Sequence, residues 1–247
     1  MKVSVIPMDI VWGDPAKNIE QAQQLIQQTD VSDLYVLPEM WATGFATKPE
    51  GIAEDEKKSE ALQWMRDFAA VNHAAICGSL AIRTSDGIYR NRHYFVTPDH
   101  VVYYDKHHLF THGHEDLFFT PGEHAVIAQW HGFRFLLQTC YDLRFPVFSR
   151  YGIAGEYDAI IYVANWPSSR QLAWDTLIRA RAIENQSYVI AVNRIGFDPV
   201  THYDGGSAII SPLGKTAEGL TAELSLDALG QMRDRFRVLD DRDQLTL

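Results

Sequence analysis

Three residues in this chain have side chains that could carry out a reaction together, and each follows a short apolar run. They are Glu39, Lys106 and Cys140, the last of which comes after the mostly apolar residues 133–137. Continuous apolar runs of this length are typical of buried strands, and open α/β sheets place reactive groups at strand ends. An acid, an amine and a thiol at three strand ends form a candidate catalytic group.

The chemistry that fits these side chains is acyl transfer. Only the thiolate of a cysteine attacks, and with a pKa of ~8.5 roughly 3% of a free thiol is ionised at neutral pH. Glu39 is the candidate base for the Cys140 proton, and Lys106 is the candidate cation for charge that develops on the substrate oxygen. The backbone N–H of Tyr141 is a second candidate donor to that oxygen. Such a set would form a thioester that water hydrolyses to the acid.

Each of these residues also has a purely structural interpretation. A cysteine at the end of an apolar strand is usually a small core residue. Glu39, after Pro38, could cap a helix, and Lys106 could be a solvated strand end. The second cysteine, Cys77, lies within a predicted strand and is expected in the core. The joint placement of three reactive residues favours catalysis over the separate structural interpretations.

Composition limits the class of protein. The 247 residues are 46% apolar and 22% charged, with a net charge of −10. These values predict a single globular domain over residues 1–247, and the acidic balance disfavours a nucleic-acid partner. No apolar stretch reaches the length of a membrane span, so no membrane partner is expected. Two cysteines do not form a disulfide framework, and the N-terminus lacks a signal-peptide core, so the cytoplasm is the expected location.

Strand and helix patterns alternate along the chain, which favours an α/β sandwich. Helices are predicted from Pro15 to about Gln28, after a cap at Ser59, and over residues 171–185. A long functional loop is expected over residues 107–124, and the charge-rich tail from Asp227 is expected to be helical. The predicted strands span residues 3–8, 34–37, 74–82, 88–97, 101–106, 125–129, 133–137, 158–164, 187–193, 207–210 and 223–226.

The segments around the three reactive residues resemble the nitrilase superfamily of carbon–nitrogen hydrolases. The matching blocks are Leu37-Pro-Glu-Met-Trp, Tyr104-Asp-Lys-His-His-Leu-Phe and Cys140-Tyr-Asp-Leu-Arg-Phe-Pro, supported by Gly44-Phe and Asn165-Trp-Pro. The resemblance covers about residues 1–225. It implies an αββα sandwich whose dimers stack into a four-layer αββα–αββα assembly, with the tail from about residue 227 as a candidate interface. A homodimer or a higher even oligomer is therefore expected.

The resemblance also implies catalytic roles. Cys140 would be the nucleophile, Glu39 the general base and Lys106 the oxyanion stabiliser. The family has a further glutamate in the loop after the lysine, which helps to position substrate and lysine. Glu115 matches that position best, and the alternatives are Asp116 and Glu123, because the loop length varies.

The cysteine block and the motif that follows it resemble the omega-amidase branch of the family, especially its bacterial members. Such enzymes hydrolyse the terminal amide of 2-oxo acids such as 2-oxoglutaramate and 2-oxosuccinamate, giving ammonia and a dicarboxylate. Arg144 is then expected to bind the distal carboxylate through two parallel hydrogen bonds, although it could instead pair with Asp142 or Glu184. Trp166 and Phe45 are expected to wall and close the pocket, or else to pack in the core.

Other functions are possible. Another superfamily amidase, acting on deaminated glutathione or on an N-carbamoyl amino acid, would use the same triad. A non-catalytic binding protein of this fold would have lost the triad, which is intact here. Ser207 lacks the Gly-x-Ser-x-Gly elbow of a serine hydrolase, and no nucleotide-binding pattern occurs.

A metal site is the remaining possibility, because histidines gather after the lysine, at His107, His108, His112 and His114. They lie in a predicted loop, without the helical His-Glu-x-x-His register that aligns two zinc ligands. Neither a metal nor any other cofactor is therefore expected, and His108 is expected to pack or to hydrogen-bond near Lys106.

Overall fold

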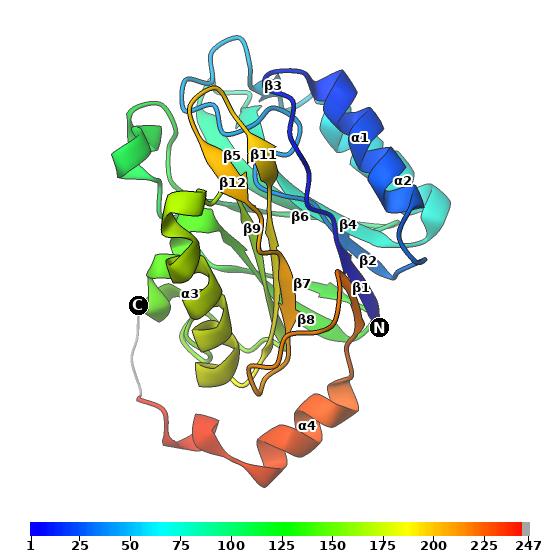
Figure 1. Ribbon diagram of the computed structural model, residues 1–247, viewed down its shortest axis with the longest axis vertical. Helices are drawn as coiled ribbons and strands as arrows, with labels where there is room; N and C mark the ends of the chain where they lie inside the picture. The colour runs from blue at the N-terminus through cyan, green and yellow to red at the C-terminus, as the bar shows by residue number, and fades with distance from the viewer. Residues whose placement is uncertain (244–247) are drawn as a thin grey trace.

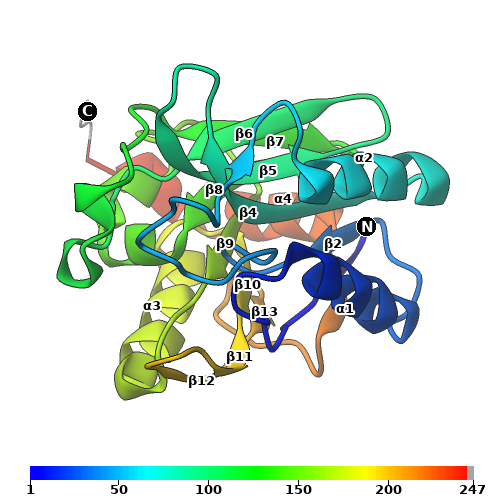
Figure 2. The same cartoon turned by 90° about the horizontal axis from the view of Figure 1, so that it is seen from above.

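The computed structural model describes residues 1–243 and contains two β-sheets packed face to face, with helices on both outer faces (Figures 1 and 2). The seven-stranded sheet has the order β14 (Thr221–Glu223), β1 (Lys2–Val5), β2 (Leu34–Val36), β4 (Ala75–Arg83), β5 (Tyr89–Val96), β6 (Val101–Asp105), with β3 (Glu54–Asp55) paired to β4. The five-stranded sheet has the order β13 (Ala208–Ile210), β10 (Tyr188–Asn193), β9 (Ala159–Ala164), β8 (Phe133–Thr139), β7 (Val126–Trp130).

The parallel strands of both sheets bring reactive residues to one end of the sandwich. In the first sheet β1, β2 and β4 run parallel, and in the second β8, β9 and β10 do so. Glu39 follows β2, Cys140 directly follows β8, and Asn165 directly follows β9. Residues far apart in the sequence therefore meet where these strands end.

Apolar side chains fill the space between the two sheets and the space under the helices. Alternation along β8 shows the division: Phe133, Phe135 and Leu137 face the space between the sheets, whereas Leu136 packs on the outer side. Phe95 of β5 stacks on Phe135 across the sandwich, with ring centroids 5.5 Å apart. Because both of its faces are covered, β9 is apolar along its whole length.

Residues 1–243 form four α-helices, and three of them begin at a polar cap. The four helices are α1 (Pro15–Gln27), α2 (Glu60–Asn72), α3 (Gln171–Glu184) and α4 (Leu226–Arg235). Asp14, Ser59 and Ser225 each accept a hydrogen bond from a backbone N–H in the first turn of the helix that follows. α1 and α2 pack on the first sheet and α3 on the second (Figure 1). The structure confirms the predicted αββα sandwich.

Several element bounds differ from the sequence-based expectation. The last strand is β14, at Thr221–Glu223 rather than at 223–226, because Ser225 caps α4. The first strand ends at Val5. A hairpin of β11 (Ile195–Phe197) and β12 (His202–Asp204) was not predicted, and neither was β3. The predicted loop at 107–124 contains two short 3₁₀ turns.

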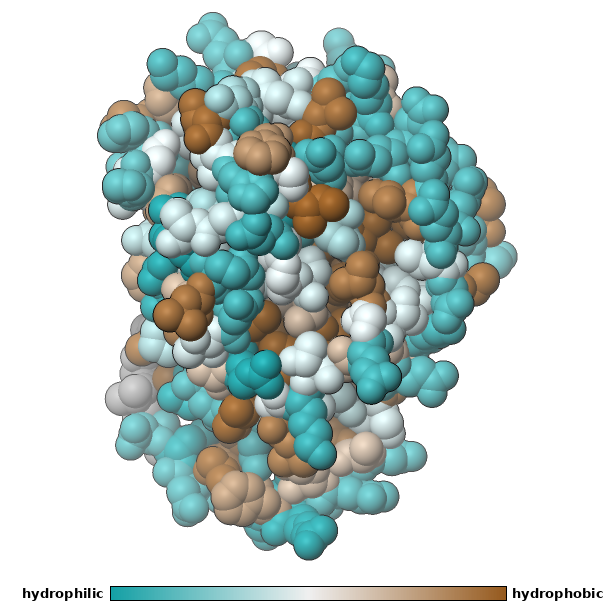
Figure 3. Space-filling model, in the orientation of Figure 1, coloured by the Kyte–Doolittle hydropathy of each residue, from teal (hydrophilic) through white to brown (hydrophobic). Residues whose placement is uncertain are grey.

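The surface is mostly hydrophilic over α1 and α2, and apolar side chains gather near α4 (Figure 3). Among residues 1–243, no helix is long and apolar enough to cross a bilayer.

Candidate active site

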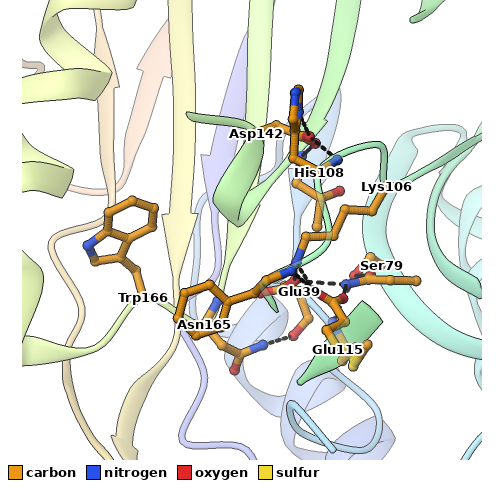
Figure 4. A network of polar contacts seen from close by, with 12 residues as sticks. Glu39, Ser79, Lys106, His108, Glu115, Asp142, Asn165 and Trp166 are labelled. Carbon is orange, nitrogen blue, oxygen red and sulfur yellow. Dashed lines mark hydrogen bonds and ion pairs between the residues drawn. The ribbon is translucent and has the colours of Figure 1, made fainter. Parts of the chain in front are cut away.

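The fold brings Glu39, Lys106 and Cys140 together, as their positions after strands predicted. Lys106 directly follows β6 in the first sheet, whereas Cys140 follows β8 in the second. Their exposed fractions are 0% for Glu39, 1% for Lys106 and 8% for Cys140. The site therefore lies between the ends of the two sheets (Figure 4).

Lys106 lies between two carboxylates. Its Nζ donates to Glu39 Oε1 at 2.8 Å and to Glu115 Oε2 at 2.8 Å, and all three side chains are fully buried. Of the three acidic candidates in the loop, Glu115 is the one brought to the lysine. Asp116 is exposed, and the Glu123 side chain is 87% exposed.

The electrostatics of the group keep the thiol protonated at rest. Burial raises the pKa of Cys140 well above its usual value, and the neighbouring Glu39 charge raises it further. Burial opposes the charge on Lys106, but Glu115 and Glu39 outweigh that effect and raise its pKa. A protonated thiol next to a carboxylate needs that base to remove its proton during attack.

A hydrogen-bonded turn holds Cys140 in position. Its φ of 44° lies in the left-handed region that non-glycine residues rarely adopt. Asp142, fully buried, accepts from Thr139 N at 2.9 Å and so closes the turn around the cysteine. It also accepts from Tyr104 Oη at 2.8 Å, and from His108 N and Nδ1 at 3.0 and 2.8 Å. The turn that carries the thiol is thus tied to the strand and loop that carry the lysine.

A cavity of about 390 Å³ opens in front of Cys140. The four predicted substrate-binding residues, Phe45, Tyr141, Arg144 and Trp166, all line it. The Phe45 ring centroid is 5.2 Å from Lys106 Nζ, so this ring lies over the inner end of the cavity.

Arg144 makes no ion pair with any residue in the range 1–243, so the predicted structural alternative is not found. Asp142 bonds Tyr104, His108 and the Thr139 backbone. Glu184 pairs with Arg181 at 2.9 Å and with Arg150 at 3.5 Å. The Arg144 guanidinium instead lies 5.0 Å from the Trp166 ring centroid, on the cavity wall.

Trp166 packs in the core and also lines the cavity, so the two predicted alternatives for this residue are both found. It is 2% exposed, and its backbone N–H and its indole Nε1 donate to Asn193 Oδ1 and to the Arg170 carbonyl, at 2.7 and 2.9 Å. These bonds fix the ring as a rigid wall.

Several residues of the site were not assigned a role from the sequence. Asn165 N donates to Glu39 Oε2 at 2.9 Å, and its Nδ2 donates to the Glu39 carbonyl at 2.6 Å. Its motif was recognised, but the motif does not reveal this bond. Asn91 contacts both carboxylates, and Arg170 lines the cavity with its guanidinium 5.2 Å from the Phe110 ring centroid.

The histidines that follow Lys106 have separate partners. His107 stacks on Phe148 with ring centroids 4.4 Å apart, and its Nδ1 lies 2.7 Å from the Gly122 carbonyl. His108 bonds Asp142, as its predicted position near the lysine suggested. Within residues 1–243, no three histidine, cysteine or acidic side chains are grouped closely enough to hold a metal ion.

Comparison with known proteins places this site in context. The family model for carbon–nitrogen hydrolases matches residues 2–230. Omega-amidase YafV of Yersinia enterocolitica is 40% identical, covering 100% of this chain and 98% of that protein. The 2-oxoglutaramate amidase of Bacillus subtilis is 31% identical, covering 97% and 96%. A CN-hydrolase superfamily protein of Xanthomonas campestris, solved with an arsenic adduct in its active site, is 40% identical with a TM-score of 0.93, covering 100% and 98%.

Proposed function

Because this chain belongs to the carbon–nitrogen hydrolase family, we propose that it is an omega-amidase acting on small 2-oxo dicarboxylic acid monoamides. The expected substrates are 2-oxoglutaramate and 2-oxosuccinamate, and the products are the dicarboxylate and ammonia. Relatives that are 31–40% identical over nearly their whole length are an omega-amidase and a 2-oxoglutaramate amidase, and they support hydrolysis of an amide.

The observation that carries the substrate class is the charge of the cavity. Three cationic side chains, Lys48, Arg144 and Arg170, line it and form no ion pair with residues 1–243, although the whole chain has a net charge of −10. The acidic residue on the wall, Asp198, accepts from two backbone N–H groups and from Tyr203 Oη. An amide whose far end carries a carboxylate would complement these cations.

The proposed reaction uses the residues around Lys106. Cys140 Sγ attacks the amide carbon while Glu39 takes the thiol proton, and the resulting oxyanion is stabilised by Lys106 and by the Tyr141 N–H. The C–N bond then breaks, Glu39 returns its proton to the leaving nitrogen, and ammonia departs. Water then attacks the thioester carbon while Glu39 takes a proton from it. The C–S bond breaks, the acid departs, and Glu39 returns the proton to Cys140 Sγ. Glu115 positions Lys106 throughout.

Two further inferences accompany this function. The chain is proposed to form one domain over residues 1–247, of which 244–247 lie outside the described residues, and to assemble as a dimer or a higher even oligomer on the basis of the family resemblance. The cytoplasm remains the predicted location, and both cysteines are unpaired, in keeping with a reducing compartment.

Ammonia release from purified protein tests the substrate proposal. Rapid release from 2-oxoglutaramate, with slow release from pentanamide, glutamine and an N-carbamoyl amino acid, is the expected result. Release mainly from the N-carbamoyl compound, or from deaminated glutathione, would replace the omega-amidase assignment with another amidase of the family. The Cys140→Ala variant is the background control.

A further inference from the structure

Asn91 of β5 bridges the two buried carboxylates that also flank Lys106. It is 1% exposed, and its Nδ2 donates to Glu39 Oε1 at 2.8 Å and to Glu115 Oε1 at 2.9 Å. The two hydrogens of one amide nitrogen are therefore both used, one on each carboxylate.

Ser79 fixes which way the Asn91 amide points. The backbone N–H of Met40, which can only donate, bonds Ser79 Oγ at 2.9 Å. The Ser79 hydroxyl in turn donates to Asn91 Oδ1 at 2.8 Å, which leaves Nδ2 facing the carboxylates. Met40 directly follows Glu39 and has a φ of 43°, so the same chain of bonds supports the strained backbone that aims the glutamate. Figure 4 shows Ser79 beside Glu39 and Glu115.

The charges at this site explain why such a donor is needed. Two carboxylates face a single cation, Lys106, in a fully buried space, and two like charges in that setting favour uptake of a proton by one of them. Asn91 supplies two hydrogen bonds that a carboxylate can accept and a protonated carboxyl oxygen accepts less well. No further charge is introduced by this neutral amide.

We propose that Asn91 is a positioning residue that directs Glu39 and Glu115 at Lys106 and keeps Glu115 ionised, so that Glu39 is held where it acts as the base. The proposal rests on the catalytic role proposed for Glu39. The titratable groups that face the two carboxylates are Lys106, at the end of β6, and Cys140, after β8.

The sign of the effect follows from the hydrogen bonds. Burial raises the pKa of Glu115, whereas Lys106 and the Asn91 amide lower it. Removing the amide leaves the burial effect less opposed, so the pKa of Glu115 rises further and the pair takes up a proton at higher pH. The acid limb of the activity profile then moves to higher pH.

The Asn91→Leu variant tests the proposal, because it keeps a similar volume and removes both donors. We expect kcat for 2-oxoglutaramate at neutral pH to fall about tenfold to a hundredfold, KM to change little, and the acid limb of kcat/KM to shift upward. Ser79→Ala keeps the amide but removes its anchor, and should shift the limb in the same direction by less. If Asn91→Leu does not fold, the shift of the acid limb in Ser79→Ala tests the proposal on its own.

Asn185→Leu is the matched control, since Asn185 is also fully buried and bonds only to backbone groups of Tyr151 and Arg181, away from the cavity. It should lower Tm without moving the acid limb. If Asn91→Leu lowers Tm but leaves the acid limb of kcat/KM unchanged, Asn91 has only a structural role and the proposal is overturned.

A second readout separates this proposal from the substrate assignment. The pH dependence of Cys140 alkylation by iodoacetamide, followed by mass spectrometry of its peptide, requires no substrate. In Asn91→Leu, the inflection caused by proton uptake at the carboxylates should appear at higher pH than in the wild type. That shift would support the role of Asn91 even if 2-oxoglutaramate is not hydrolysed, and an unchanged profile would contradict it.

Discussion

The inner and outer ends of the cavity differ in how their charges are satisfied. At the inner end, Glu39, Lys106 and Glu115 are fully buried, and each is held by short bonds within the protein. At the outer end, Arg144 and Arg170 lie on the cavity wall and pair with no acidic residue of the described chain. The charges of the first region are paired within the protein, whereas the cations of the second can pair with an anionic ligand.

This difference indicates that the inner end carries out the reaction and that the outer end discriminates between substrates. A buried charge network that is satisfied in advance needs no reorganisation when charge develops on the substrate. Unpaired cations on a cavity wall gain a partner only when an anionic substrate arrives, so they distinguish one amide from another. The inner end should therefore serve any amide, and the outer end should decide which amide is used.

The largest expected effect comes from breaking the inner network with Glu39→Gln. Loss of the base should lower kcat by about 10²–10⁴ on every amide that the enzyme accepts. Alkylation of Cys140 at neutral pH should become faster, because the Glu39 charge that raises the pKa of the thiol is gone. Stopped-flow kinetics and timed alkylation measure the two effects.

The exposed Glu123→Gln is the matched control and should alter neither rate. An undiminished kcat in Glu39→Gln would contradict a base at this position, and a lowered Tm in the same variant would mean that the substitution has disturbed the cysteine turn.

A smaller and selective effect is expected at the outer end from Arg144→Lys. Lysine keeps the charge but loses the two parallel hydrogen bonds, so kcat/KM for 2-oxoglutaramate should fall about tenfold. Turnover of pentanamide, which has no carboxylate, should be unchanged in steady-state assays.

Arg150→Lys, in which the changed residue pairs with Glu184 outside the cavity, controls for the loss of a guanidinium. An equal loss on both substrates would remove the distinction between the two ends of the cavity.

The smallest effect is expected from Lys48→Met. Lys48 is exposed at the cavity rim, where charge is screened, and kcat/KM for 2-oxoglutaramate should fall only about twofold to threefold. The deficit should disappear at high salt. Lys57→Met, at an exposed position outside the cavity, should show neither effect, and a deficit that persists at high salt would argue against a screened charge at the rim.

The sequence predicted the reactive residues and most elements but missed residues at both ends of the cavity, for physical reasons. Strand ends and caps such as Ser59 are local signals, so most elements and the positions of the reactive residues could be predicted. The hairpin of β11 and β12 could not, because its strands are short and Phe197 is 68% exposed. Short exposed strands give no apolar pattern.

The missing site residues depend on long-range packing. Asn91 lies within an ordinary strand pattern, and only the placement of β5 beside both glutamates gives it a role. Arg170 stands 30 residues after Cys140 in the printed sequence, and the fold alone brings it to the cavity. No local pattern encodes either position.

The most direct test is mass spectrometry of the wild-type enzyme quenched in acid during turnover of 2-oxoglutaramate. The account predicts that the peptide containing Cys140 carries the acyl group left when the substrate loses ammonia, and that Cys140→Ala neither forms this adduct nor releases ammonia. An acyl group on another residue, or continued turnover by Cys140→Ala, would contradict it.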